Sequence, residues 1–328
     1  MKKIPLIIDC DPGKDDALCI MLLGASEKYD VRGITAVHGN VPLEKTAANA
    51  LFLSSYYGIN CPVYRGAEAA ILVRPERASY VHGENGLAGY EYSLDGLEYA
   101  EDHAWDFQYE TAKACAGELE IVAVGPLTNL AITILKHPDF AGLVKRLVVM
   151  GGGATAGNTS PLAEFNFQQD PHAAEIVLQA GFRDLTIVDL DCCYSAWLNR
   201  EEQQIMAELP ETNKIHGLIR QIMEHKKISD ENIIRKHGKN HGGDRINHMI
   251  ICDATAAAVA IDPTLAQYWD VYMVCETEGE LTMGQAIIDR LGFARKTNVH
   301  LAMNMDRDRY AALFMEGLKH YEEVSGND

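Results

Sequence analysis

The sequence has no apolar run long enough to cross a bilayer, so a membrane-spanning helix is not expected. The N-terminus, MKKIPLIIDCDPG, combines two lysines with a short apolar run, as a signal peptide does. It then reaches Asp9 and Asp11 without a small-residue cleavage pattern. We therefore interpret this segment as a first β-strand, and we expect a cytoplasmic protein without a membrane partner.

Basic residues are scarce, with 29 lysines and arginines against 47 acidic residues and a net charge of −18. This balance disfavours nonspecific binding to nucleic acid or to an anionic membrane. None of the eight cysteines forms a CxxC pair, and most lie in apolar runs such as ALCIMLL and DLDCCYS. Buried free thiols are the expected state, rather than disulfides or a zinc site.

Two nucleotide-binding fingerprints are also missing. The glycine run MGGGATAGN follows a predicted strand and could hold an anion through its backbone amides. No GK[ST] and no GxGxxG completes a phosphate-binding motif, however, so the run alone does not predict a nucleotide.

The first half of the chain alternates short β-branched runs with helical patterns. The predicted strands are Ile4–Asp9, Val31–Val37, Pro62–Arg65, Glu120–Val124, Val144–Met150 and Leu185–Leu190. The predicted helices between them are Asp15–Glu27, Leu43–Tyr57, Trp105–Ala116, Leu127–Leu135 and His172–Ala180. This alternation predicts an α/β fold, Rossmann-like, with a mostly parallel central sheet and helices on both faces.

The second half is richer in helices, with patterns at Arg200–Leu209 and Thr212–Lys227. The polar segment SDENIIRKHGKNHGGDRIN, residues 229–247, is typical of a mobile loop or lid. A helix at CDATAAAVAID follows, then strands at Val271–Cys275, Leu281–Asp289 and Val299–Met305, and a helix from Asp308. Since no linker or repeat divides the chain, we expect residues 1–328 to form one elaborated domain.

Four aspartates lie within IIDCDPGKDDAL, at a strand-to-helix junction where Pro12 and Gly13 make the turn. The helix macrodipole accounts for one or two carboxylates at such a position. A hard cation that prefers oxygen ligands accounts for the rest. A DxD after a first strand also occurs in aspartate-nucleophile phosphatases, so this segment alone is chemically ambiguous.

Further polar residues follow the predicted strands or lie in irregular segments. AVHGN ends the second strand with Asn40, and VHGENG places His82 between glycines in a long irregular stretch. In EFNFQQDP, Glu164 and Asn166 are two residues apart, so in extended chain they would point to one side and could hold a diol. Because ligands collect at the carboxyl ends of parallel strands, these residues are candidates for one site.

Together these segments resemble a known family. DCDPGKDDA, GN at 39–40, VHGENG, VGPLTN, MGGG…N…EFN…DP and CDATAA occur in the order and spacing of the inosine-uridine nucleoside hydrolase family, from about residue 4 to residue 262. Members hydrolyse the N-glycosidic bond of ribonucleosides around a tightly held Ca²⁺ ion and are commonly dimers or tetramers. The resemblance therefore implies a ribonucleoside substrate, a calcium cofactor and a homodimer or homotetramer.

The resemblance also implies a role for each matching position. The metal ligands would be Asp11, Asp16, Asp253 and the Val124 carbonyl. Asp15 and Asn40 would contact ribose or order the attacking water. The ribose hydroxyls would be bound by Asn158, Glu164 and Asn166, with His82 near the base. Asp11 would take the proton of the water, and the carboxylates would stabilise an oxocarbenium-like transition state.

One position departs from the family pattern. Many members carry a histidine directly before the last aspartate ligand, where it serves as an acid towards the leaving base, but this chain has Cys252. A thiol is a poor replacement for imidazole in that role. The resemblance is therefore to the branch of the family that has cysteine in place of this histidine. The other candidates for the leaving-group region are His82, His237, His241 and His248.

Two other functions remain open from the sequence. The DxD pattern allows a metal-dependent phosphohydrolase with Asp9 or Asp11 as nucleophile, although no lysine partner stands out. Cys252 in place of the acid allows a non-catalytic nucleoside- or ribose-binding protein. The preference for purine or pyrimidine is not predicted, because it depends on the loops at 76–85 and 228–248.

Overall fold

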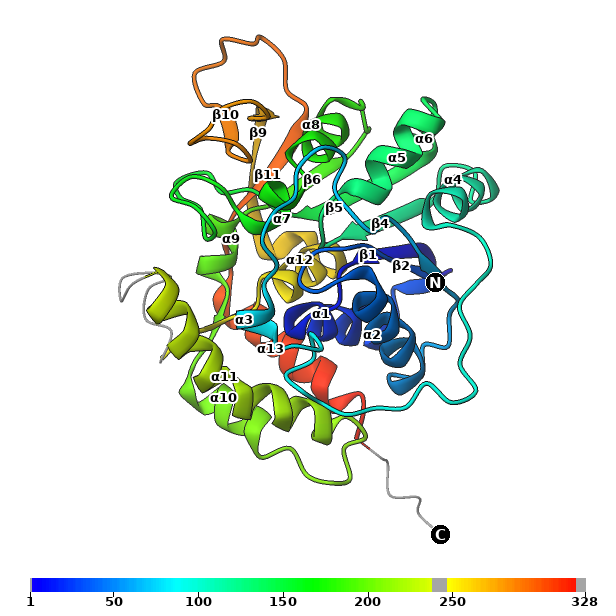
Figure 1. The fold of residues 1–328 in the computed structure, drawn as a ribbon, viewed down its shortest axis with the longest axis vertical. Helices are drawn as coiled ribbons and strands as arrows, with labels where there is room; N and C mark the ends of the chain where they lie inside the picture. Colours follow the sequence, from blue (N-terminus) through cyan, green and yellow to red (C-terminus); the bar gives the residue numbers. More distant parts are fainter. Residues whose placement is uncertain (1, 238–246, 323–328) are drawn as a thin grey trace.

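A computed structural model describes residues 2–237 and 247–322 of the chain. Nine strands form one sheet in the order β10-β9-β11-β6-β5-β4-β1-β2-β3 (Figure 1). Their bounds are β1 Ile4–Cys10, β2 Tyr29–Ala36, β3 Val63–Arg65, β4 Leu119–Ala123, β5 Val144–Met150, β6 Leu185–Val188, β9 Ala266–Cys275, β10 Ala286–Asp289 and β11 Val299–Met305. Strands from β3 across to β11 are parallel, whereas β9 and β10 run antiparallel to their neighbours.

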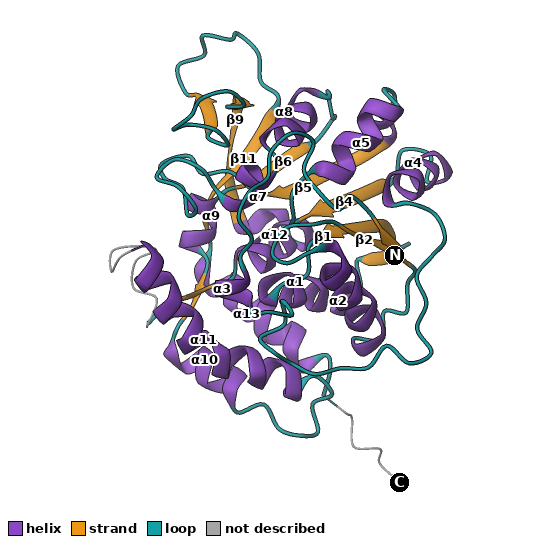
Figure 2. Cartoon of the chain, in the orientation of Figure 1, coloured by secondary structure: helices purple, strands orange, loops and turns teal. Residues whose placement is uncertain are grey.

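Helices cover both faces of the sheet (Figure 2). One face packs against α1 Lys14–Ala25, α2 Leu43–Tyr56, α12 Cys252–Ile261 and α13 Arg307–Lys319. The other packs against α4 Ala104–Ala114, α5 Thr128–Lys136, α6 Phe140–Leu143 and α8 Pro171–Gln179. Beside the first face lie α9 Leu190–Ser195, α10 Arg200–Ala207, α11 His216–His237 and the small β7–β8 pair, Trp197–Leu198 and Met249–Ile250. None of the helices in the described residues is long and apolar enough to span a membrane.

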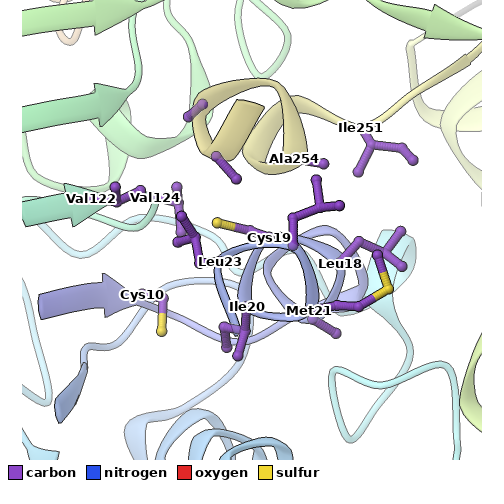
Figure 3. Packing of buried hydrophobic residues seen from close by; sticks show 14 of the residues in the cluster. Cys10, Leu18, Cys19, Ile20, Met21, Leu23, Val122, Val124, Ile251 and Ala254 are labelled. Carbon is purple, nitrogen blue, oxygen red and sulfur yellow. The ribbon is translucent and has the colours of Figure 1, made fainter. Parts of the chain in front are cut away.

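The core beneath the first face is built around α1. Figure 3 shows Cys19 and Leu23 of α1 beside Val122 and Val124, with Ala254 of α12 nearby. α12 is made largely of buried alanines, and these small side chains let it pack directly against α1. This close approach brings the start of α12 to the start of α1, although the two helices are far apart in the sequence.

The predicted α/β class with a mostly parallel sheet and helices on both faces is confirmed. Residues 229–237 of the predicted loop are helical, because α11 continues to His237, and residues 238–246 lie outside the described residues. Ser229 and Ile233 are buried, so this polar stretch has a narrow packed face that stabilises it as helix. The strand predicted from Leu281 begins only at Ala286, since Gly284 takes a positive φ of 83° in a turn. The strand predicted to Leu190 ends at Val188, because Asp189 is the N-cap of α9 and Leu190 is its first residue.

Asp9 lies at the centre of the sheet, fully buried, and its side chain faces α4 and α5. Its Oδ1 accepts hydrogen bonds from Gln108 Nε2 at 3.0 Å, Asn129 Nδ2 at 2.9 Å and the Thr35 hydroxyl. Burial raises the pKa of this carboxyl to about 6, against the lowering effect of these donors. Asp9 thus ties β1 and β2 to two helices and points away from the residues at the strand ends.

We expect Asp9→Ala to lower the free energy of unfolding by about 3 kcal/mol, because three buried donors lose their common acceptor. Asp9→Asn keeps an oxygen for those donors and is expected to cost much less. Urea denaturation at pH 7 measures both variants. Equal losses in the two variants would contradict this account of the network.

Candidate active site

The candidate site lies where the sheet reverses its strand order. β1 lies between β2 and β4. The connection after β1 leads to β2 and the connection after β4 leads to β5, so the two run in opposite directions along the sheet. In parallel α/β sheets such a point opens a crevice at the carboxyl ends of the strands. Asp11 follows β1 directly, and Val124 follows β4. Their positions in the chain therefore place both at the mouth of this crevice.

Three carboxylates come together beside Asp11. Asp15, Asp16 and Asp253 can each offer one oxygen such that the three oxygens lie within 4.8 Å of one another. Asp16 lies at the third position of α1, where its Oδ2 accepts the Gly13 amide at 2.9 Å and its Oδ1 accepts the Asp11 amide at 3.2 Å. Asp253 reaches the cluster from α12, so segments from opposite parts of the chain build it.

The environment of these carboxylates fits a cation. Burial raises the pKa of Asp16 to about 7, with the Asp15 charge as a further cause, and burial raises the pKa values of Asp11 and Asp253 well above their usual range. The side-chain oxygens Oδ1 of Asp11 and Oδ1 of Asp15 are buried and lack a hydrogen-bond partner. Clustered carboxylates with free oxygens are the donor set that a hard divalent ion such as Ca²⁺ prefers.

Two glycines leave room for the Asp11 side chain. A Cβ atom at Gly39 would lie 2.0 Å from Asp11 Oδ2, and one at Gly125 would lie 2.7 Å from Asp11 Oδ1. The same carboxylate accepts the Asn40 amide at 2.6 Å through Oδ2. The Asn40 side chain bridges the two aspartates, since its Nδ2 donates to the Asp11 carbonyl at 3.0 Å and to Asp16 Oδ2 at 3.1 Å. The AVHGN segment therefore fixes Asp11 in one orientation.

A cavity of about 170 Å³ opens above the carboxylates. The predicted site residues that line it are Asp15, Asn40, His82, Val124, Asn158, Glu164, Asn166, Cys252 and Asp253. Asp11 and Asp16 are buried, beside the residues that line the cavity. The structure thus brings the predicted metal and ribose positions together around one space.

The sequence suggested that Glu164 and Asn166 lie in one extended stretch, but the extended chain ends at Glu164 and Asn166 lies in a helix. Glu164 is the N-cap of α7, Phe165–Gln169, and its carboxylate accepts the Asn166 and Phe167 amides at 2.8 and 3.1 Å. The Gly152 amide donates to the same carboxylate at 3.0 Å. The Gly152 amide of the glycine run therefore binds an anion, and that anion is the Glu164 carboxylate of the same chain. Burial raises the pKa of Glu164 to about 7.

Asn166 and Asn158 hold the remaining wall of the cavity. Asn166 Nδ2 donates to the Val124 carbonyl at 2.9 Å and to the Met150 carbonyl at 3.1 Å, so it joins the ends of β4 and β5. Asn158 Oδ1 accepts the Phe165 amide at 2.8 Å. Both side chains line the cavity, where their other polar atoms can meet a ligand.

His82 ends the short helix α3, Ser79–His82, and lies beside Asp15. Its Nδ1 accepts the Lys14 amide at 3.1 Å, so in the neutral ring the proton is assigned to Nε2. Burial lowers the pKa of His82 to about 4, with the nearby Lys14 and His225 acting in the same direction against Asp15. His82 is therefore a neutral hydrogen-bond donor at physiological pH.

The other leaving-group candidates lie in different places. His248 stacks on Trp197 with ring centroids 3.8 Å apart, and it lines an adjoining cavity of about 110 Å³ that also touches Asp15 and His82. His237 is the last residue of α11, and His241 lies outside the described residues. Cys252 begins α12 and lines the main cavity.

Several lining residues were not found from the sequence. Tyr80, Tyr194 and Ile233 contribute to the cavity from α3, α9 and α11. Tyr194 belongs to DCCYS, which follows β6 at the same edge of the sheet, so its position behind a predicted strand was an available signal. Ile233 was missed because its segment was interpreted as a loop.

Comparisons with known proteins show which protein family this chain resembles. The family model described as inosine-uridine preferring nucleoside hydrolase matches residues 6–312. The chain is 31% identical over 305 residues to the non-specific ribonucleoside hydrolase RihC of Escherichia coli strain SMS-3-5, with 93% of this chain and 94% of that protein covered.

The chain is also similar to solved structures of nucleoside hydrolases. The purine-preferring ribonucleoside hydrolase from Gardnerella vaginalis is similar with a TM-score of 0.86 and 26% identity, over 98% of this chain and 100% of that one. The plant nucleoside hydrolase PpNRh1 is similar with a TM-score of 0.84 and 27% identity, over 97% and 99% of the two chains.

The tight fit around Asp11 gives a test of the cation site. We expect Gly39→Ala to weaken divalent-cation binding by about 10- to 100-fold, the range seen when groups that orient metal ligands are disturbed. The rise of Tm during a Ca²⁺ titration measures this affinity. Gly142→Ala is the matched control, because a Cβ at Gly142 meets nothing within 4 Å. Equal titration curves for the two variants would show that Gly39 does not fix a metal ligand.

Proposed function

The chain belongs to the inosine-uridine preferring nucleoside hydrolase family, and on this premise we propose a calcium-dependent ribonucleoside hydrolase that uses the cavity above the aspartates. As a member of this family it is an N-glycosyl hydrolase. The observation that carries the proposal is the meeting of the cation-binding carboxylates and the polar wall of Glu164, Asn158 and Asn166 around one cavity.

We propose that the polar wall binds ribose. The Glu164 carboxylate is held by three backbone amides, and Asn166 is held by two carbonyls, so both side chains are fixed before substrate arrives. Groups held in this way orient the ribose hydroxyls at little entropic cost. The transition state spreads positive charge over the sugar ring, and the surrounding carboxylates stabilise that charge as it develops.

The proposed cation ligands are Asp11, Asp16, Asp253 and the carbonyl of Val124. When bound, Ca²⁺ supplies positive charge that balances the carboxylates, polarises water and orients the ribose hydroxyls. Asp11 is the proposed proton acceptor for the attacking water, because its Oδ1 is free while Oδ2 is fixed by Asn40. Asp15 also has a free oxygen and lines the cavity, and we propose that it contacts ribose.

Departure of the base requires a hydrogen-bond donor or an acid. We propose that the Nε2–H of His82 is such a donor, since Nδ1 is occupied by the Lys14 amide. Cys252 lines the cavity beside Asp253 and replaces the histidine of many relatives. Base preference is then proposed to depend on Cys252 and on the walls formed by α3 and α11.

We also propose one nucleoside-hydrolase domain across residues 1–328, a homodimer or homotetramer, and a cytoplasmic location without nucleic-acid or membrane partners. Cys10, Cys19, Cys61, Cys115, Cys192, Cys193, Cys252 and Cys275 are all free thiols, which supports a reducing compartment. The net charge of −18 supports the absence of a nucleic-acid partner.

The phosphohydrolase alternative named Asp9 or Asp11 as its nucleophile, and the position of Asp9 removes the first of these two candidates. Its side chain is enclosed by Thr35, Gln108 and Asn129 and faces away from the cavity, so it cannot attack a ligand there. The non-catalytic alternative rested on Cys252 alone, and the matched relatives are named as hydrolases.

Ribose release from inosine, adenosine, guanosine, uridine, cytidine and nicotinamide riboside tests the function. We expect turnover of ribonucleosides, weak turnover of their 2′-deoxy forms, and loss of activity on removal of Ca²⁺ with a chelator.

Asp11→Asn should lower kcat by about 10²- to 10⁴-fold, as loss of a general base does, while Asp15→Asn should mainly raise KM. The reverse pattern would identify Asp15 as the base, and no turnover of any ribonucleoside would contradict the proposal. Cys252→His in the same panel should change the ratio of purine to pyrimidine turnover.

The protonation of His82 gives a second test. Its pKa of about 4 means that its charge changes only near that pH, and the ring is neutral above it. His82→Asn should lower kcat/KM by about 10-fold, the effect of one lost hydrogen bond. The dependence of kcat/KM on pH between pH 5 and pH 8 should keep its wild-type shape, because the variant loses no group that titrates in that range. Disappearance of a limb of the profile would show instead that His82 acts as an acid.

A further inference from the structure

The helices α1 and α12 lie side by side and are in contact at both of their ends. Both begin at the cavity, because Asp15 near the start of α1 and Asp253 near the start of α12 line it. Their far ends meet as well, since Lys28, in the turn after α1, reaches the last residues of α12. A helix of 10 residues is about 15 Å long, which is the distance that separates the two contacts.

The Lys28 ammonium binds the far end of α12 through the backbone. Its Nζ donates to the Ala260 carbonyl at 2.6 Å and to the Ile261 carbonyl at 3.2 Å. These are the last two residues of α12, where carbonyls have no partner inside the helix. The helix dipole also favours a cation at this end. Lys28 therefore ties the end of α12 to the end of α1 without using any side chain of α12.

Tyr29, the first residue of β2, contacts the same end of α12. Its hydroxyl lies 2.7 Å from the Ala260 carbonyl and 2.9 Å from Glu120 Oε2 of β4. A hydroxyl has one proton, so Tyr29 can donate to only one of these acceptors at a time. The Lys28 ammonium has three protons and serves both α12 carbonyls at once. Lys28 is therefore the main polar contact of this helix end, and Tyr29 supports it.

The buried surface of α12 offers little to fix its position along its own axis. Large side chains that interdigitate stop one helix from sliding along another. Most of the buried side chains of α12 are methyl groups, and Figure 3 shows Ala254 directly beside α1. The fully buried alanines of α12 are Ala254, Ala256, Ala257, Ala258 and Ala260.

The start of α12 is under a force that the far end must resist. The carboxylates of Asp16 and Asp253 lie in one cluster with Asp15, and like charges at this range repel. In the absence of a cation, this repulsion pushes the start of α12 away from α1. A contact that holds the other end of the helix limits this displacement, because an α-helix moves as a rigid element.

We propose that Lys28 is a positioning residue for the cation site, which holds α12 so that Asp253 lies beside Asp16 before the ion binds. The proposal rests on the cation site proposed above and extends it to a residue at the amino ends of the strands, on the opposite side of the sheet from the cavity. Lys28 touches neither the ion nor the substrate and acts through α12.

Calorimetric titration of Ca²⁺ into the full chain, freed of metal with a chelator, tests the proposal. Lys28→Met keeps the length of the side chain and removes the ammonium, and we expect it to raise the Kd for Ca²⁺ by about 10-fold, as loss of a group that orients metal ligands does. Lys28→Arg keeps a cationic donor and should restore most of the affinity. Lys145→Met is the matched control, because it also removes a cation beside Glu120 but one that pairs with Glu118 and Glu120 instead. An unchanged Kd in folded Lys28→Met, or an equal loss in Lys145→Met, would overturn the proposal.

The Tm values with and without Ca²⁺ separate positioning from plain stabilisation. Since binding and position are linked, Lys28→Met should lower the Tm of the Ca²⁺-bound protein more than that of the calcium-free protein. Equal losses would mean that the contact only stabilises the fold, and would overturn the proposal. The Ca²⁺ concentration for half-maximal ribose release should rise by the same factor as the Kd, while kcat at saturating Ca²⁺ stays close to that of the wild type.

Tyr29→Phe is the milder variant, for use if Lys28→Met does not fold. It removes one donor that is shared with Glu120, so we expect the Kd for Ca²⁺ to rise by about threefold. An unchanged Kd would then overturn the proposal. Failure of the wild type to bind Ca²⁺ would contradict the cation site itself, whereas a wild type that binds Ca²⁺ beside unaffected variants would contradict only the role of Lys28.

Discussion

The constraint on which the site depends is the repulsion among the carboxylates that follow β1 and open the helices α1 and α12. Two unit charges about 4 Å apart interact by about 4 kcal/mol at an effective dielectric constant of about 20. Asp15, Asp16 and Asp253 approach to this range, and Asp11 is buried beside them. Amides of Gly13, Asp11 and Asn40 relieve part of the repulsion. A bound cation is the partner that would remove the rest, which is why we propose Ca²⁺ at this position.

The fold explains how such a crowded site is assembled. The switch in strand order between β1 and β4 opens a crevice, and the loops after β1, β2, β4 and β5 line it. The alanine-rich α12 packs closely on α1 and delivers Asp253 to Asp16. Glycines at 39 and 125 leave the space that the Asp11 carboxylate fills. Packing in the core and chemistry at the strand ends are therefore set by the same helices.

Much of this arrangement could be predicted from the sequence. Asp11 and Asn40 come shortly after apolar β-branched runs and Val124 ends one, so their common edge follows from the parallel sheet. Asp253 could be joined to them only through the family resemblance, because its closeness depends on how α12 packs against α1. The Glu164 segment was misjudged, since the same spacing suits an extended chain and an N-cap. The helical continuation to His237 was missed because its polar composition hides the single packed face that includes Ser229 and Ile233.

We propose that the aspartates bind one calcium ion. Metal analysis by mass spectrometry of the protein, purified in Ca²⁺ and then freed of unbound metal, tests it most directly. The account predicts about one calcium per chain in the wild type, in line with a single cluster of oxygen ligands, and a large loss in Asp16→Asn. A wild-type protein that retains no calcium, or an Asp16→Asn variant that retains as much as the wild type, would contradict the account.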